Sequence, residues 1–144
     1  MKQVCAAVDE LHASKIIHRD IKPENIVLHE GVYKLCDFGW SVALGNKMRT
    51  TFCGTPLYVC PEILKGNEYD EKIDIWSLGI MMYEMLVGEN PFKISKEEEL
   101  IKIVKEQIAI PSYVYVSKEA RDFLDKALQK NPSDRVTIKQ LVNH

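Results

Sequence analysis

The sequence lacks the features of a metal-stabilised, secreted or membrane protein. Its 144 residues include four cysteines, and no two of them form a CxxC pair, which argues against a zinc site or a disulfide framework. Lys and Arg number 19 against 21 Asp and Glu, so binding to nucleic acid is not expected. The longest apolar stretch, residues 73–87, carries two carboxylates and is too short for a bilayer, so no membrane contact is expected. The amphipathic N-terminus is unlike a secretory leader, and we expect an intracellular protein of the cytoplasm or nucleus.

Helical patterns fill most of the chain. Five segments carry apolar residues at helical spacing and are predicted as helices: 2–13, 72–87, and those that open at Ser95, Ser117 and Thr137. The segment 72–87 is apolar on nearly every side and is followed by Gly88, which is typical of a helix buried in the middle of a domain. The helix from Ser95 is expected to open on a capping box with Glu98 and to reach Ile108.

Two strand-like runs, 25–28 and 33–36, predict a small hairpin, and three short motifs surround it. The motifs are His18-Arg-Asp-Ile-Lys-Pro-Glu-Asn25 before the first run, Asp37-Phe-Gly39 after the second, and Cys60-Pro-Glu62 further on. The intervening segment 39–61 has no sustained period, and a structureless stretch of that length is usually a functional loop. The sequence therefore predicts a mainly α fold, a helical bundle around one buried central helix with a hairpin on its surface.

The residue types in these motifs suit phosphoryl transfer. That reaction needs a carboxylate to orient a hydroxyl nucleophile and accept its proton, and Asp20 fits this role. Asn25 and Asp37 offer oxygen ligands, which Mg²⁺ prefers, and the hairpin between them would bring both oxygens to one side. Lys22 supplies a mobile cation near the transferred phosphate.

In their order and spacing the motifs resemble the catalytic loop, the metal-binding DFG and the end of the activation segment of protein kinases. The resemblance implies a protein-kinase-like C-terminal lobe with ATP and Mg²⁺ as cofactors. It implies catalytic roles for Asp20, Lys22, Asn25 and Thr55. It implies cofactor contacts for Lys22, Glu24, Asn25, Val27 and Asp37, with Asn25 and Asp37 as the metal ligands.

The resemblance extends to a subclass. A lysine two residues after the catalytic Asp, here Lys22, resembles the pattern of serine/threonine kinases. The run 54–58 resembles the same pattern. Trp40 after the DFG and the run 49–55 resemble the Aurora kinases. Pro56-Leu57 is closer to the wider basophilic group, so another related serine/threonine kinase stays open.

An activation phosphosite is expected at Thr51. A phosphate there would add about two negative charges and could pair with Arg19 and Arg49, which would order the loop. Because Arg49 precedes Thr51 by two residues, the pattern also fits self-phosphorylation by a basophilic kinase.

Substrate choice follows from the same resemblance. Glu24 and Glu84 match two acidic positions that hold an Arg two residues before the target, because a carboxylate binds guanidinium as a fork. Phe52, Pro56 and Val59 would line an apolar pocket for the residue after the target. The expected partners are protein substrates with Arg or Lys near a Ser or Thr.

Two buried pairs and a ring contact are expected to hold the site. Asp74 should accept backbone N–H bonds from His18 and Arg19, and Glu62 should pair with Arg135. His18 and Phe38 match an inner stack that links the catalytic loop to the lobe.

Several kinase parts are not found. The seven glycines form no G-x-G-x-x-G, and no strand lysine, helix glutamate or adenine-binding hinge precedes residue 18. We therefore expect residues 1–144 to be the C-terminal lobe alone, truncated at both ends and inactive by itself. Its partners would include the missing N-terminal lobe and activating proteins, and the resemblance implies spindle or chromosome association. The competing reading is a naturally truncated lobe that docks partners without catalysis.

Overall fold

Helix α3 (Lys72–Val87) is the centre of the fold in the computed structural model, which describes residues 1–43 and 56–143. It buries residues on every side over most of its length, as the all-round apolar pattern predicts. It ends at Gly88, whose φ of 86° is left-handed and which donates its N–H to the Glu84 carbonyl. The predicted central helix is thus confirmed with the same bounds.

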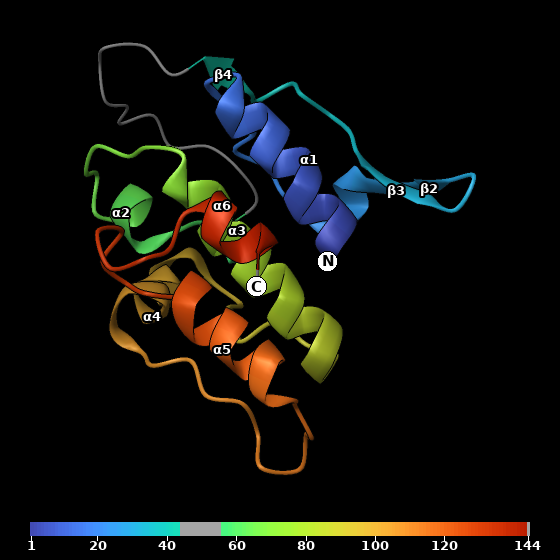
Figure 1. Cartoon of the computed structure of the whole chain (residues 1–144). Coiled ribbons are helices and arrows are strands. Elements are labelled where there is room, and N and C mark those ends of the chain that lie inside the picture. Colours follow the sequence, from blue (N-terminus) through green and yellow to red (C-terminus); the bar gives the residue numbers. More distant parts are fainter. Residues whose placement is uncertain (44–55, 144) are drawn as a thin grey trace.

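The other helices pack around α3 (Figure 1). They are α1 (Lys2–Ala13), α2 (Pro61–Leu64), α4 (Ile101–Lys105), α5 (Lys118–Ala127) and α6 (Ile138–Val142). Short 3₁₀ turns span Pro23–Asn25, Pro56–Tyr58 and Glu97–Leu100. Ser117 caps α5 as predicted, because its hydroxyl accepts the Ala120 N–H at 3.2 Å. At the N-terminus of α6, the Gln140 side chain accepts the Thr137 N–H at 2.8 Å, as in a capping box.

The helix predicted from Ser95 is wrong in its start and in its length. No capping box forms with Glu98. Instead the Ser95 N–H donates to the Glu99 carboxylate at 2.7 Å, and a 3₁₀ turn precedes α4. The α4 helix ends at Lys105, before Ile108, because Glu106 takes an extended conformation with ψ of 141°.

Two small antiparallel sheets complete the fold. Strands β2 (Ile26–His29) and β3 (Val32–Leu35) form the predicted hairpin, which projects from the helices (Figure 1). Glu30 and Gly31 both have positive φ, at 50° and 76°, as a tight turn between twisted strands requires. Strands β1 (Ile16–Ile17) and β4 (Val42–Ala43) form a second pair that the sequence did not predict, because each has only two residues.

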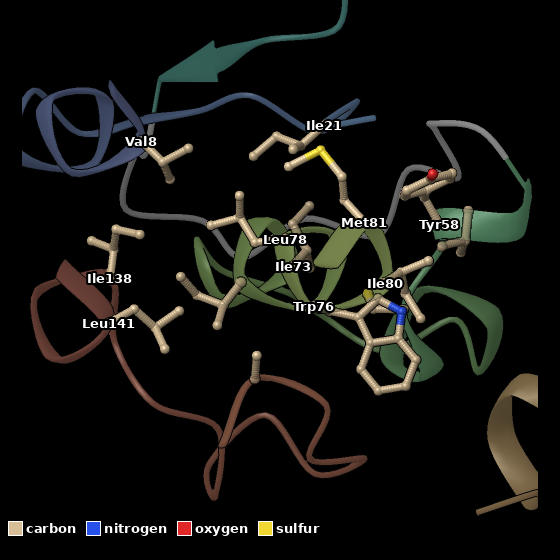
Figure 2. Close-up of a cluster of buried hydrophobic side chains, with 14 of the residues drawn as sticks. Val8, Ile21, Tyr58, Ile73, Trp76, Leu78, Ile80, Met81, Ile138 and Leu141 are labelled. Carbon is tan, nitrogen blue, oxygen red and sulfur yellow. The ribbon is translucent and has the colours of Figure 1, made fainter. Parts of the chain in front are cut away.

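The core lies around α3. Ile80 and Met81 lie on the side of α3 nearer Tyr58, whereas Val8, Ile138 and Leu141 approach the helix from α1 and α6 (Figure 2). Trp76 is fully buried and stacks on Phe92 with ring centroids 6.5 Å apart. In the described parts of the chain, no helix has the length and apolar character needed to cross a membrane.

Gly79 of α3 packs closely against the C-terminal end of α5. A Cβ there would meet the Leu128 side chain at 2.6 Å and the Ala127 Cβ at 3.1 Å. Gly79→Ala should therefore overpack the interface and cost about 1–3 kcal/mol of stability. Urea unfolding would measure the loss as a lower midpoint at unchanged slope. In a Leu128→Ala background the same change should cost less, and an equal cost in both backgrounds would rule out this clash.

Candidate active site

Asp20 lies in the segment between β1 and the 3₁₀ turn and is almost completely buried, with 6% of its surface exposed. Lys22 Nζ is 2.9 Å from its carboxylate. The Asn25 amide nitrogen donates both to the Asp20 carbonyl at 2.7 Å and to its carboxylate at 3.0 Å. Three residues of the first motif therefore meet at one carboxylate, which is held in a fixed orientation by charge-assisted hydrogen bonds.

The loop that carries Asp20 is anchored on α3 by Asp74. The buried Asp74 carboxylate accepts the backbone N–H groups of His18 and Arg19, both at 2.9 Å. It also lies 2.8 Å from His12 Nε2 of α1. Buried backbone donors need such partners, so Asp74 fixes the main chain just before Asp20. Sequence analysis missed His12, although it continues the Val4 and Val8 stripe of α1 at helical spacing.

Asp37 lies two residues after the end of β3 and close to Asn25. The Cys36 N–H donates to the Asn25 carbonyl at 2.9 Å, so the chain just before Asp37 is paired with Asn25. Asp37 is exposed, has φ of 59°, and accepts the Gly39 N–H at 3.1 Å. The hairpin therefore brings the two oxygen-bearing residues to one end of the sheet.

Within residues 1–43 and 56–143, no group of three or more His, Cys, Asp and Glu side chains could hold a metal alone. Asn25 and Asp37 fit a Mg²⁺ that takes its remaining oxygen ligands from phosphate and water. The Asn25 amide nitrogen is held by Asp20, which leaves the amide oxygen as the atom for a metal.

Ring and guanidinium contacts tie the two motifs together. His18 and Phe38 meet edge to face with centroids 5.1 Å apart, and His18 Nε2 lies 3.1 Å from the Cys36 carbonyl oxygen. Arg19 has φ of 73° and donates to the Trp40 carbonyl at 2.6 Å and to the Tyr69 hydroxyl at 2.8 Å. Positive φ at both Arg19 and Asp37 is the kind of backbone strain that collects at functional sites.

An acidic pair lies around Tyr58. The Tyr58 hydroxyl donates to Glu84, which is partly buried near the end of α3. Burial raises the pKa of Tyr58, and the Glu84 hydrogen bond and the charges of Glu84 and Glu24 raise it further. Glu84 therefore contacts the hydroxyl directly, and the fold places the charge of Glu24 within electrostatic range of it.

Glu62 and Arg135 form a buried, two-pronged ion pair at 2.7 and 3.1 Å. Arg135 also donates to the Lys72 carbonyl at 2.8 Å and lies 5.2 Å from the Trp76 ring centroid. The pair joins α2 to the loop before α6.

The remaining residues singled out by the sequence differ in their placement. Val27 is 48% exposed on the hairpin, Pro56 is exposed, and Val59 is buried in the core at 3%. In the structure Val59 is therefore a core residue. Four further residues lie outside the described part of the chain: Arg49, Thr51, Phe52 and Thr55.

Comparisons with known proteins identify the family of the chain. A family description of the protein kinase domain matches residues 1–144. The chain belongs to the protein kinase family. Among curated kinases it is 44% identical over 146 residues to Aurora kinase A-B of Xenopus laevis, covering 100% of this chain and 35% of that protein.

Two yeast relatives give the same result. Aurora kinase of Debaryomyces hansenii is 48% identical over 147 residues, and Aurora kinase of Schizosaccharomyces pombe is 46% identical over 145 residues. Each match covers 99% of this chain, and 35% and 40% of those proteins. The predicted Aurora-like character of this kinase chain is confirmed, and the chain spans well under half the length of these relatives.

Proposed function

We propose that the chain is the C-terminal lobe of an Aurora-like kinase that transfers the terminal phosphate of ATP to Ser or Thr in basic protein segments. The observation that carries the proposal is the cluster at Asp20. There a buried carboxylate is oriented by Lys22 and Asn25, next to the strand end that presents Asp37.

In this proposal Asp20 orients the substrate hydroxyl and takes its proton. The hydroxyl oxygen forms a bond to the terminal phosphorus, the bond from phosphorus to the bridging oxygen breaks, and ADP leaves. Lys22, 2.9 Å from Asp20, places a positive charge where the transferred phosphate would pass. Positioning and charge stabilisation supply most of the catalysis in such reactions.

Asn25 and Asp37 would hold Mg²⁺, which neutralises charge on the phosphates when bound. The exposed Val27 on the hairpin would lie beneath the adenine ring, a role that fits an apolar side chain left open to solvent. Glu24, also exposed, would contact the nucleotide ribose side of the site or the substrate.

Activation is proposed to involve phosphate on Thr51. Arg19 would then pair with that phosphate together with Arg49, and Thr55 would contact Asp20 and Lys22. Arg19 is already held at the site by Trp40 and Tyr69, so the phosphate would join an ordered network.

Glu24 and Glu84 are proposed to select an Arg before the target residue, with Phe52, Pro56 and Val59 near the residue that follows it. The support is the contact of Glu84 with the Tyr58 hydroxyl and the charge of Glu24 within electrostatic range of it. A hydroxyl that donates to Glu84 fixes the carboxylate before the substrate arrives, which lowers the cost of binding a guanidinium.

Glu84→Gln should raise KM for a peptide with Arg two residues before the target by about tenfold, because it removes the charge of the ion pair. The kcat should change little, because Glu84 bonds to Tyr58 and takes no part in the contacts of Asp20 with Lys22 and Asn25. The matched control is the same peptide with that Arg replaced by Ala, whose KM should not respond to the variant. An equal loss on both peptides would contradict the assignment.

An N-terminal lobe would complete the ATP cleft, and the exposed Phe38 and Trp40, each 50% exposed, face where such a partner would add contacts. Activating proteins and a spindle or chromosome setting inside the cell are part of the same proposal and rest on the Aurora-like sequence. The second candidate is a lobe that only docks partners, a function that needs no Asp20 cluster.

The intact mass of the endogenous protein separates these two functions. An antibody to residues 96–107 would capture it from its source cells. A species far heavier than 16.5 kDa that phosphorylates a basic peptide supports the kinase. A species near 16.5 kDa without phosphate transfer would overturn the kinase proposal in favour of docking.

A further inference from the structure

A groove on the opposite side of α3 from the catalytic loop's anchor is not used by the proposed catalysis. Its volume is about 540 Å³, within the range of ligand sites, and it lies between Tyr83 of α3, the segment 107–110, helix α5 and the loop 129–134. Ile108, Leu124 and Leu128 supply its apolar floor. We refer to it as the α5 groove.

One wall of the α5 groove is a backbone segment that belongs to no helix or strand. Residues 107–110 follow the end of α4 and take no helical or strand pairing. Among the described residues, the hydrogen bond to this wall comes from the Tyr83 hydroxyl, which donates to the Ala109 carbonyl at 3.0 Å. Backbone groups usually find partners, so the free backbone groups of this segment can take hydrogen bonds from a bound peptide.

The other wall presents two opposite charges that do not pair with each other. Arg121 and Asp125 are one turn apart on α5, are exposed, and line the groove. Neither side chain makes an ion pair or a hydrogen bond with the described residues, although the next pair on the helix, Asp122 and Lys126, closes at 2.6 Å. Spacing on the helix would allow the first pair, so its two charges are left for another molecule.

Lys130 holds one end of the α5 groove in place. Lys130 donates to the Ile103 carbonyl at 2.5 Å, and its amine lies 5.0 Å and 4.8 Å from the ring centroids of Trp76 and Phe92. The loop that forms one end of the groove is thereby tied to α4 and α3. A preformed site costs a ligand less than one that must be ordered.

We propose that the α5 groove binds an extended peptide segment of a partner protein that carries one acidic and one basic side chain. Its backbone pairs with residues 107–110, its acidic side chain pairs with Arg121, and its basic side chain pairs with Asp125. An apolar side chain between them packs on Leu124 and Leu128. The backbone of residues 107–110, which lies outside helix and strand pairing, favours a peptide over a small molecule, because a peptide supplies backbone donors and acceptors of its own.

The test starts from random peptides displayed on phage and selected on the natural protein that contains this chain. Selected peptides are synthesised and their Kd values measured on wild type and on the charge swap Arg121→Glu/Asp125→Arg. The matched control is Asp122→Arg/Lys126→Glu, which swaps an exposed pair of the same helix that does not line the groove. Neither double variant changes the net charge.

We expect selected peptides to bind the groove swap about tenfold more weakly and the control swap with unchanged affinity. Exchanging the acidic and basic residues of the peptide should restore binding to the groove swap. Bound peptide should also slow amide hydrogen exchange at residues 107–110.

Three results would overturn the proposal. The first is selection that yields no peptide above background. The second is peptides that bind the groove swap as tightly as wild type, which would place them elsewhere, including the substrate cleft. The third is binding without slowed exchange at residues 107–110, which would exclude the backbone pairing. Since no step uses Asp20, failure of the catalytic proposal would leave this test unaffected.

Discussion

Asp20→Asn is expected to lower kcat for phosphate transfer by about two to four orders of magnitude in the natural protein that contains this chain. The amide keeps the shape of the carboxylate and its contact with Asn25, but it cannot accept the proton of the substrate hydroxyl. Lys22 also loses the negative charge that holds it at 2.9 Å. Steady-state rates with a basic serine peptide would measure the loss, with KM for the peptide nearly unchanged.

Glu30→Gln is the matched control for this prediction. Glu30 is a carboxylate in the turn of the same hairpin, and its side chain is 85% exposed. Its variant should keep wild-type kcat. If Asp20→Asn kept more than a tenth of the activity, Asp20 would not be the residue that accepts the proton.

The largest expected effect on stability comes from Arg135→Met. Methionine fills much of the same space but leaves Glu62 as an unpaired carboxylate in a site where it is 3% exposed. Removing one partner of such a buried pair costs about 3–5 kcal/mol. The variant also loses the bonds from Arg135 to the Lys72 and Gln129 carbonyls. Urea unfolding followed by tryptophan fluorescence would measure the difference.

An exposed ion pair gives the comparison for Arg135. Lys126 and Asp122 are 2.6 Å apart with nearly half of each side chain exposed. Lys126→Met should therefore cost less than about 1 kcal/mol. Adding Glu62→Gln to Arg135→Met should recover part of the loss, because it removes the buried charge. Equal costs for Arg135→Met and Lys126→Met would contradict a structural role for the buried pair.

Much of the fold followed from short-range patterns. The all-round apolar run gave the bounds of α3, and the strand-like runs around Glu30-Gly31 gave the hairpin. Propensity failed at Ser95, where a 3₁₀ turn and an extended Glu106 replaced a longer helix. Apolar spacing shows which face is buried, but it does not show where packing against neighbours ends a helix.

The candidate site was predictable where its residues share one motif. Asp20, Lys22 and Asn25 meet because they lie close together in the sequence, in the short segment 20–25. The partners His12 and Tyr58 were missed, since each reaches its carboxylate across a long stretch of sequence. The one sequence signal for His12 was its place as a polar residue on the apolar stripe of α1. No sequence pattern indicated that the Tyr58 hydroxyl contacts Glu84.

Transfer of labelled terminal phosphate from ATP, catalysed by the natural protein that contains this chain, tests the central claim most directly. The acceptors are a basic peptide with a serine target, its threonine form and its tyrosine form, each in the presence of Mg²⁺. The account predicts label on the serine and threonine peptides, little on tyrosine, and loss of label when Mg²⁺ is removed. Absence of label on all three, or equal label on tyrosine, would contradict it.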